Sequence, residues 1–235
     1  HKEYRRQRQM CIRDRAYSPR GLFEVEHVSK EPVERLTPMG VMVLALLLEG
    51  DMHPYEMVRL MRARRDERLL AVTNGTLYHT VGRLQRGGLI DEVGTDREGN
   101  RPERTTYTLT DAGRDALIGW LRRELSIIDR PAEFRIALAE AHNLERPDVV
   151  DCLRIRRVAL AEGHALHRDG LTGARRKGAP EQVLVEFERQ EVLLDAELRW
   201  LDSLLDRLEA EAFPWGPTAF ENTDRYLAQR KAAQQ

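Results

Sequence analysis

Residues 73–90 join a helix directly to the beginning of a strand, which limits the folds open to the chain. Thr73 can cap a helix, because its hydroxyl accepts hydrogen bonds from the backbone N–H groups that begin one. Apolar residues follow at spacings of four and three, on one helix face: Leu77, Val81 and Leu84. Gly87 and Gly88 favour the helix end, since glycine adopts the left-handed conformation found there. Beyond them the apolar period shortens toward two, which predicts a strand.

The opposite face of this predicted helix is small, polar or basic and carries no carboxylate. Its members are Gly75, Thr76, His79, Gly82, Arg83 and Arg86, with Tyr78 on the flank. The whole chain has a net charge of −1, but residues 59–86 hold seven arginines against two acids, a local charge of +5. A short helix with such a face can enter a DNA major groove, where binding depends on local phosphate contacts.

The elements around this helix predict a mainly α fold with one β-hairpin. In chain order they are helices at 38–48, 53–65 and 73–86, strands at 89–93 and 105–109, and a helix from 110 to about 125. Thr37 and Pro38 predict the first helix start, and that helix is apolar almost all round, as a central core helix is. In the second helix, four arginines are expected to face outward: Arg59, Arg62, Arg64 and Arg65. The loop between the strands is polar, with Gly99 and Asn100 at its expected tip.

This order is that of a winged helix-turn-helix, and several motifs resemble the PadR family of transcriptional regulators. They are Leu36-Thr37-Pro38-Met39-Gly40, Pro54-Tyr55-Glu56, Asn74-Gly75-Thr76-Leu77-Tyr78, Arg83-Leu84, Gly88-Leu89-Ile90 and Tyr107-Thr108-Leu109-Thr110-Asp111-Ala112-Gly113. The resemblance covers about residues 36–124. It departs from the family at His79, where members usually carry proline.

The rest of the chain is expected to be helical. Helices are predicted at residues 134–142, 148–167 and 181–210, with a loop at Gly170, Gly173 and Gly178 before the last. The last helix carries a coiled-coil seam at Leu184, Phe187, Leu194, Leu198, Leu201, Leu205 and Leu208. A helix with this apolar stripe must pack against helices of its own or of a second chain. The resemblance extends to the larger PadR subgroup, which implies a helical C-terminal dimerisation domain.

Four segments are therefore expected. They are an N-terminal extension at 1–35, a winged-helix DNA-binding domain at 36–125, a helical dimerisation domain at 130–212 and a tail at 213–235. The extension has sparse apolar residues, so we expect it to be disordered. Residues 8–15 also resemble translated adapter sequence, which favours a non-native segment over a native basic arm.

The predicted function is a sequence-specific DNA-binding repressor, responsive to an effector, that acts as a homodimer on an inverted repeat. Its half-sites would lie about one turn, ~34 Å, apart. We call the helix at 73–86 the reading helix and the hairpin formed by the two strands the wing. The expected DNA contacts on the reading helix are Asn74, Gly75, Thr76, Tyr78, His79, Arg83 and Arg86. Those on the wing are Arg97, Arg101 and Arg104. The expected dimer interface contains Leu117, Leu121, Leu194, Leu198, Leu201 and Leu205. The resemblance also implies that Trp120 offers a stacking surface to a small planar apolar effector; ordinary interface packing is the alternative.

Other function classes have weaker support in the sequence. No catalytic arrangement, phosphate-binding loop or cofactor motif is present, so an enzyme is not expected. The two cysteines of the chain are far apart, so a disulfide framework is not expected and a cytoplasmic protein is. The longest apolar run has ten residues, too few to cross a membrane. Two alternatives stay open: an interaction module that no longer binds DNA, and a metal-responsive regulator using His164 and His167. No third ligand is forced by the spacing, so no metal site is predicted.

Overall fold

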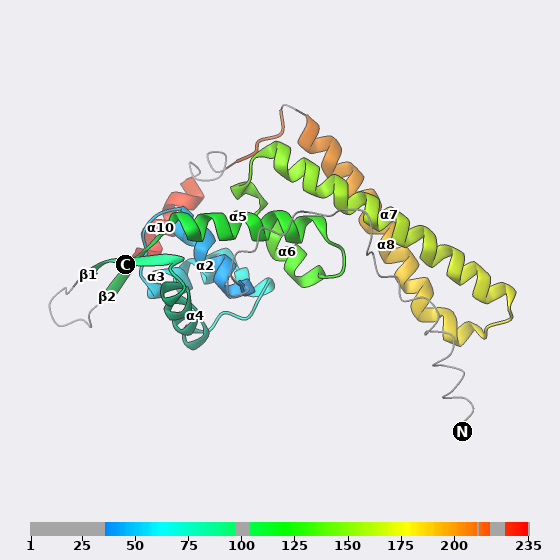
Figure 1. Cartoon of the computed structure of the whole chain (residues 1–235), viewed down its shortest axis with the longest axis horizontal. Helices are drawn as coiled ribbons and strands as arrows, with labels where there is room; N and C mark the ends of the chain where they lie inside the picture. The colour runs from blue at the N-terminus through cyan, green and yellow to red at the C-terminus, as the bar shows by residue number, and fades with distance from the viewer. Residues whose placement is uncertain (1–35, 97–103, 211, 217–223, 235) are drawn as a thin grey trace, which may run out of the picture. The chain divides into compact units, whose positions relative to one another are not determined.

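The computed structural model describes residues 36–96, 104–210, 212–216 and 224–234 (Figure 1). The predicted 1–35 extension, and the wing residues Arg97 and Arg101, lie outside these ranges. In chain order the elements are α2 (Pro38–Leu48), α3 (Pro54–Arg64), the 3₁₀ turn η1 (Asp66–Arg68), α4 (Asn74–Arg86), β1 (Ile90–Asp96), β2 (Arg104–Leu109), α5 (Asp111–Ser126), α6 (Pro131–Ala139), η2 (Ala141–Asn143), α7 (Arg146–Arg176), α8 (Glu181–Glu209) and α10 (Asp224–Gln234). The predicted winged helix, three helices followed by a hairpin, is confirmed.

The core is built around α2, whose residues 39–47 are all buried. Thr37 caps this helix, since its hydroxyl accepts from the Gly40 N–H at 3.2 Å, and Pro38 occupies the first helical position. Helix α5 packs on α2, α6 and α7. It therefore connects the predicted DNA-binding domain, which contains α2, to the predicted dimerisation domain, which contains α6 and α7. The described residues all belong to one compact unit.

The hairpin is antiparallel and pairs Ile90 with Leu109 at its base, with an irregularity between Glu92 and Gly94. Met52, in the connector before α3, exchanges two backbone hydrogen bonds of 3.0 and 3.1 Å with Tyr107 of β2. The wing is therefore held to the helices at its base as well as through the chain.

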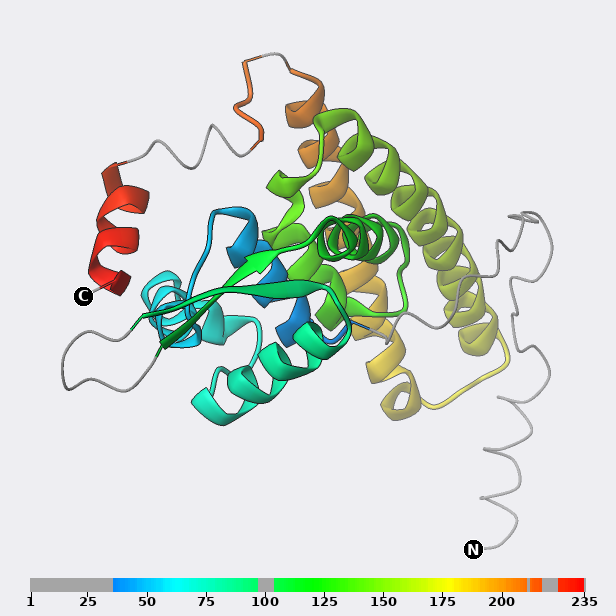
Figure 2. The ribbon, with the colours of Figure 1, turned by 60° about the vertical axis from the view of Figure 1, so that its left-hand side comes forward.

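Helices α7 and α8 lie side by side as an antiparallel pair (Figure 2). The loop predicted at Gly170, Gly173 and Gly178 is wrong for its first two residues, because α7 continues to Arg176. Only Gly178, with φ +75°, lies in the turn. Gly170 and Gly173 each lower the helix propensity of α7 by about 1 kcal/mol relative to alanine. The packing of α7 against α8 outweighs this loss.

A final helix, α10, was not predicted. It packs on α3, where the Gln229 amide donates to the Ala63 carbonyl at 3.4 Å. The Tyr226 hydroxyl donates to Glu49, at the end of α2, at 2.8 Å. Its sequence carries little apolar periodicity, so its position depends on these polar contacts and on the buried Tyr226 and Ala233.

Candidate nucleic-acid interface

Helix α4 begins and ends as its sequence predicts. The Thr73 hydroxyl accepts from the Thr76 N–H at 3.2 Å. At the other end the Leu89 N–H donates to the Leu84 carbonyl at 3.0 Å, and Gly88 takes a φ of +67°. This 6→1 bond around a left-handed glycine is a Schellman motif, which only a residue without Cβ adopts at little cost. The helix is therefore fixed at both ends.

The inner face of α4 is buried and its outer face is open. Leu77, Val81 and Leu84 are at most 3% exposed. Six predicted contact residues are exposed: Asn74, Gly75, Thr76, Tyr78, His79 and Arg86. The N-terminal N–H groups of a helix favour anions, so this end of α4 can receive a phosphate or a base edge.

Arg83 is half-buried rather than open. Its Nη2 donates to the Thr37 hydroxyl at 2.7 Å, which ties α4 to the start of α2. Arg86 lies back along the helix, with Nη1 3.5 Å from the position of a Cβ on Gly82. The bond to Thr37 uses one of the five N–H donors of Arg83, so the other donors remain for a contact with DNA.

An aromatic and cationic surface lies between α3, α4 and the wing. The guanidinium groups of Arg59 and Arg104 each lie 5.7 Å from the centre of the Tyr55 ring, within the range of cation–π attraction. A cavity of about 260 Å³ beside them is lined by Tyr78 and Tyr107 among others. Tyr55, on α3, is 45% exposed. Helix periodicity alone does not reveal that the Tyr55 ring contacts Arg104 of β2.

The outward orientation predicted for the α3 arginines is wrong at Arg64. Its two terminal nitrogens donate to both carboxylate oxygens of Glu49, at 2.6 and 2.8 Å. Burial opposes its charge, but the Glu49 carboxylate outweighs that effect and raises the pKa of Arg64. Arg62 and Arg65 are exposed and Arg59 is half-buried, so three of the four arginines leave α3 with a cationic outer side.

The leucines predicted at a dimer interface mostly lie inside the single chain. Leu117, Leu121 and Leu201 are 0% exposed and Leu205 is 7% exposed. Leu194 and Leu198 are half-buried against the same core. The seam of α8 therefore packs on its own chain, chiefly on α7. The four buried leucines have almost no surface left for a partner in this arrangement.

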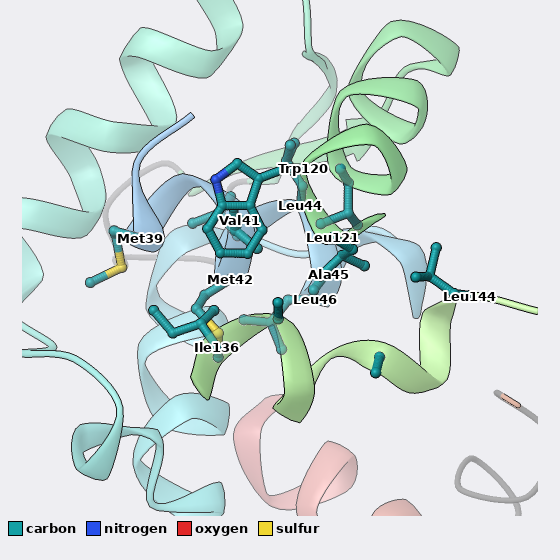
Figure 3. Packing of buried hydrophobic residues seen from close by; sticks show 14 of the residues in the cluster. Met39, Val41, Met42, Leu44, Ala45, Leu46, Trp120, Leu121, Ile136 and Leu144 are labelled. Carbon is teal, nitrogen blue, oxygen red and sulfur yellow. The ribbon is translucent and has the colours of Figure 1, made fainter. Parts of the chain in front are cut away.

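Trp120 belongs to the core. Only 3% of it is exposed, and Figure 3 shows its indole among the buried side chains of the α2 cluster. The family resemblance implied that Trp120 offers a flat stacking surface to an effector. Because the indole is buried, an effector can reach it only if the core opens.

The two histidines considered for metal binding contact their own helix pair instead. His164 Nε2 lies 2.9 Å from a Glu191 carboxylate oxygen, and His167 Nε2 lies 2.8 Å from the Phe187 carbonyl. Within the described ranges no three histidine, cysteine or acidic side chains gather as a metal site would require. None of the helices in those ranges has the length and apolar character needed to cross a bilayer.

Comparison with known proteins identifies a family for part of the chain. Residues 43–118 match the model of the Transcriptional regulator PadR-like family. No curated protein sequence matches the chain. Among solved structures, Bacillus subtilis PadR in complex with operator DNA is 18% identical, covers 74% of this chain and 100% of its own, and has a TM-score of 0.36. The smu.1604c protein of Streptococcus mutans UA159 is 18% identical, covers 71% and 98%, and has a TM-score of 0.33. A PadR-like regulator from Bacillus cereus is 16% identical, covers 74% and 99%, and has a TM-score of 0.33.

Proposed function

We propose that this protein, whose residues 43–118 match the PadR-like family model, is a sequence-specific DNA-binding repressor that acts as a homodimer on an inverted repeat. One observation carries the proposal: α4 is capped at both ends and presents an exposed face without a carboxylate. Such a face meets the negative potential of a major groove without repulsion.

The proposed contacts divide into those that select a sequence and those that add affinity. Asn74, Thr76, His79 and Arg83 are assigned to base edges, while Tyr78 is assigned to a phosphate. Gly75 contributes its backbone N–H at the helix start. The wing arginines Arg97, Arg101 and Arg104, together with Arg86, add positive charge along the backbone and the minor groove.

Dimerisation is proposed through α7, because one side of this helix leaves apolar side chains uncovered. Ile155, Val158 and Leu166 are 55–61% exposed and lie within one quarter of the helix circumference by their spacing. Exposed apolar surface of this kind marks an interaction site. A two-fold axis through it would present two α4 helices to one duplex.

The test is duplex binding by the full chain. We expect a defined sequence to be enriched from a random duplex library, with an affinity that falls steeply as salt rises, because phosphate contacts release counterions. His79→Ala should reduce discrimination at one base position by about 1–3 kcal/mol. Arg104→Ala should weaken all sequences alike and lower the salt slope by about one. Arg176→Ala, an exposed arginine at the end of α7, is the matched control.

The alternative of an interaction module predicts the opposite result. Failure to enrich any duplex, or binding that ignores salt, would contradict the repressor. Control of the repressor by an effector is part of the proposal; it requires a ligand that binds the DNA-competent and the released arrangement with different affinity.

A further inference from the structure

A cavity of about 500 Å³ lies between α2, α3, the two 3₁₀ turns, residues 213–216 and α10. Its volume falls in the range of small-molecule sites, ~300–1,000 Å³. Met42 and Leu46 of α2 provide an apolar wall, and Trp215 and Tyr226 provide aromatic surface. The Trp215 indole is held in place, since its N–H donates to the Leu144 carbonyl at 3.0 Å.

Asp66 gives this cavity a buried acidic group to which no described residue donates a hydrogen bond. The residue is 7% exposed and lines the cavity. Among the described residues its carboxylate has no hydrogen bond and no ion pair. The charges of Arg64 and Arg68 act on this carboxylate and lower its pKa, but burial outweighs them. The two terminal nitrogens of Arg64 donate to Glu49 instead. Burying an unpartnered carboxylate is costly, so the arrangement favours a cation brought from outside.

Glu140 adds a second carboxylate to the same cavity. It is half-buried and accepts one hydrogen bond, from the Asn143 amide at 3.1 Å. Burial, followed by the charges of Asp66 and Glu49, raises its pKa to about 7. Burial likewise raises the pKa of Asp66 to about 6. Among the residues that the structure describes, the other charged or titratable groups lining the cavity are Glu49, Arg64, Arg68, His142 and Tyr226.

We propose that this cavity binds an organic cation with a flat apolar body, its ammonium group held by Asp66 and Glu140 and its body packed against Trp215 and Tyr226. The carboxylates disfavour an anion. Both terminal nitrogens of Arg64 donate to Glu49, which also accepts from the Tyr226 hydroxyl at 2.8 Å, so an anion at Arg64 would compete with this carboxylate. A neutral ligand would leave the acidic pair uncompensated.

The site shares its walls with the domain that carries α4. Arg64 and Asp66 flank the end of α3, and α10 closes the cavity while contacting α3 through Arg230, whose Nη1 lies 3.7 Å from Glu56. A ligand there contacts the helix that precedes the reading helix, but the binding itself does not depend on whether the protein binds DNA.

The test uses three ligands of one shape and different charge: 2-naphthylmethylammonium, 2-naphthylmethanol and 2-naphthoate. Calorimetry with the full chain at about pH 8 should show the cation binding at least about tenfold more tightly than the alcohol, and naphthoate not binding. Asp66→Asn should weaken the cation about tenfold or more, while Glu67→Gln, an exposed acid at the next position, should leave it unchanged. Affinity for the cation should fall toward pH 5, because both carboxylates become protonated.

Two results would overturn the assignment: equal affinity for the cation and the alcohol, or a cation affinity that Asp66→Asn leaves intact in a variant whose thermal unfolding shows it to be folded. Absence of binding heat for all three ligands would also overturn it. None of these results bears on the repressor, which is tested by duplex binding alone.

Discussion

Thr37 supports two elements with a single hydroxyl, which accepts from the Gly40 N–H and from Arg83 at 2.7 Å. Removing it uncaps α2 and leaves the Arg83 guanidinium without this acceptor. Thr37→Ala should lower the free energy of unfolding by about 1–2 kcal/mol, as measured by urea denaturation. Thr37→Ser keeps the oxygen and should cost only a few tenths. An equal loss in both variants would mean that the methyl group, not the hydroxyl, matters.

Asp66 predicts a pH-dependent stability. Folding raises its pKa from 3.8 to about 6, so the folded state disfavours the ionised carboxylate. This penalty is complete above about pH 6 and disappears as the pH falls toward 4. Without ligand, Asp66→Asn should therefore raise the free energy of unfolding by about 1–3 kcal/mol at pH 8. The gain should shrink toward zero near pH 4, and a gain independent of pH would contradict the assignment.

At the residue scale, sequence reasoning succeeds where the interaction is local. Thr37, Thr73 and Thr110 each cap a helix by accepting from the N–H three residues later. A short sequence motif contains both partners, so these caps can be predicted. Arg64 pairs with Glu49, fifteen residues earlier. Its outward orientation was predicted from helix periodicity, and that pattern does not register a partner on another helix.

At the scale of elements, the start of α5 packs closely against the end of α4. Gly113 permits this, because a Cβ there would lie 2.0 Å from the Leu89 carbonyl oxygen and 2.8 Å from Leu109 Cδ1. Gly113→Ala should cost about 3 kcal/mol or more in chemical denaturation, since the backbone must move. Gly119→Ala is the matched control in the same helix. Nothing lies within 4 Å of its Cβ position, so it should stabilise by about 0.5–1 kcal/mol.

The elements that sequence predicted well are those whose patterns are strong without neighbours: α2, α4, the hairpin and α8. The ends of α7 and the whole of α10 were missed, because their stability comes from other helices. Gly170 and Gly173 suggested a loop, yet α8 pairs with α7 along this segment through Arg175 and Glu188. Helix α10 depends on Glu49 and on the end of α3, both far away in sequence.

At the scale of the whole molecule, α7 covers most of the α8 seam, which the sequence left open to a helix of the same chain or of a second chain. Buried leucines of α8 pack within the chain, and ion pairs join the two helices, among them Arg156–Glu197 at 2.6 Å. The proposed dimer uses the uncovered side of α7. This surface could not be predicted from the sequence, because it depends on which faces of α7 and α8 cover each other. The heptad pattern of α8 is compatible with a partner helix of the same chain or of a second chain.

A dimer through α7 makes DNA affinity depend on an apolar side chain far from α4 in sequence. Ile155 is 60% exposed, so Ile155→Glu should leave the fold intact while placing a charge in the proposed interface. Sedimentation should show a monomer, and duplex affinity should fall about 100-fold or more, because two linked reading helices bind more tightly than one. Ile155→Leu keeps the apolar surface and should preserve both properties. A monomeric Ile155→Glu protein with unchanged DNA affinity would show that a single α4 suffices, whereas a variant that stays dimeric would place the interface elsewhere.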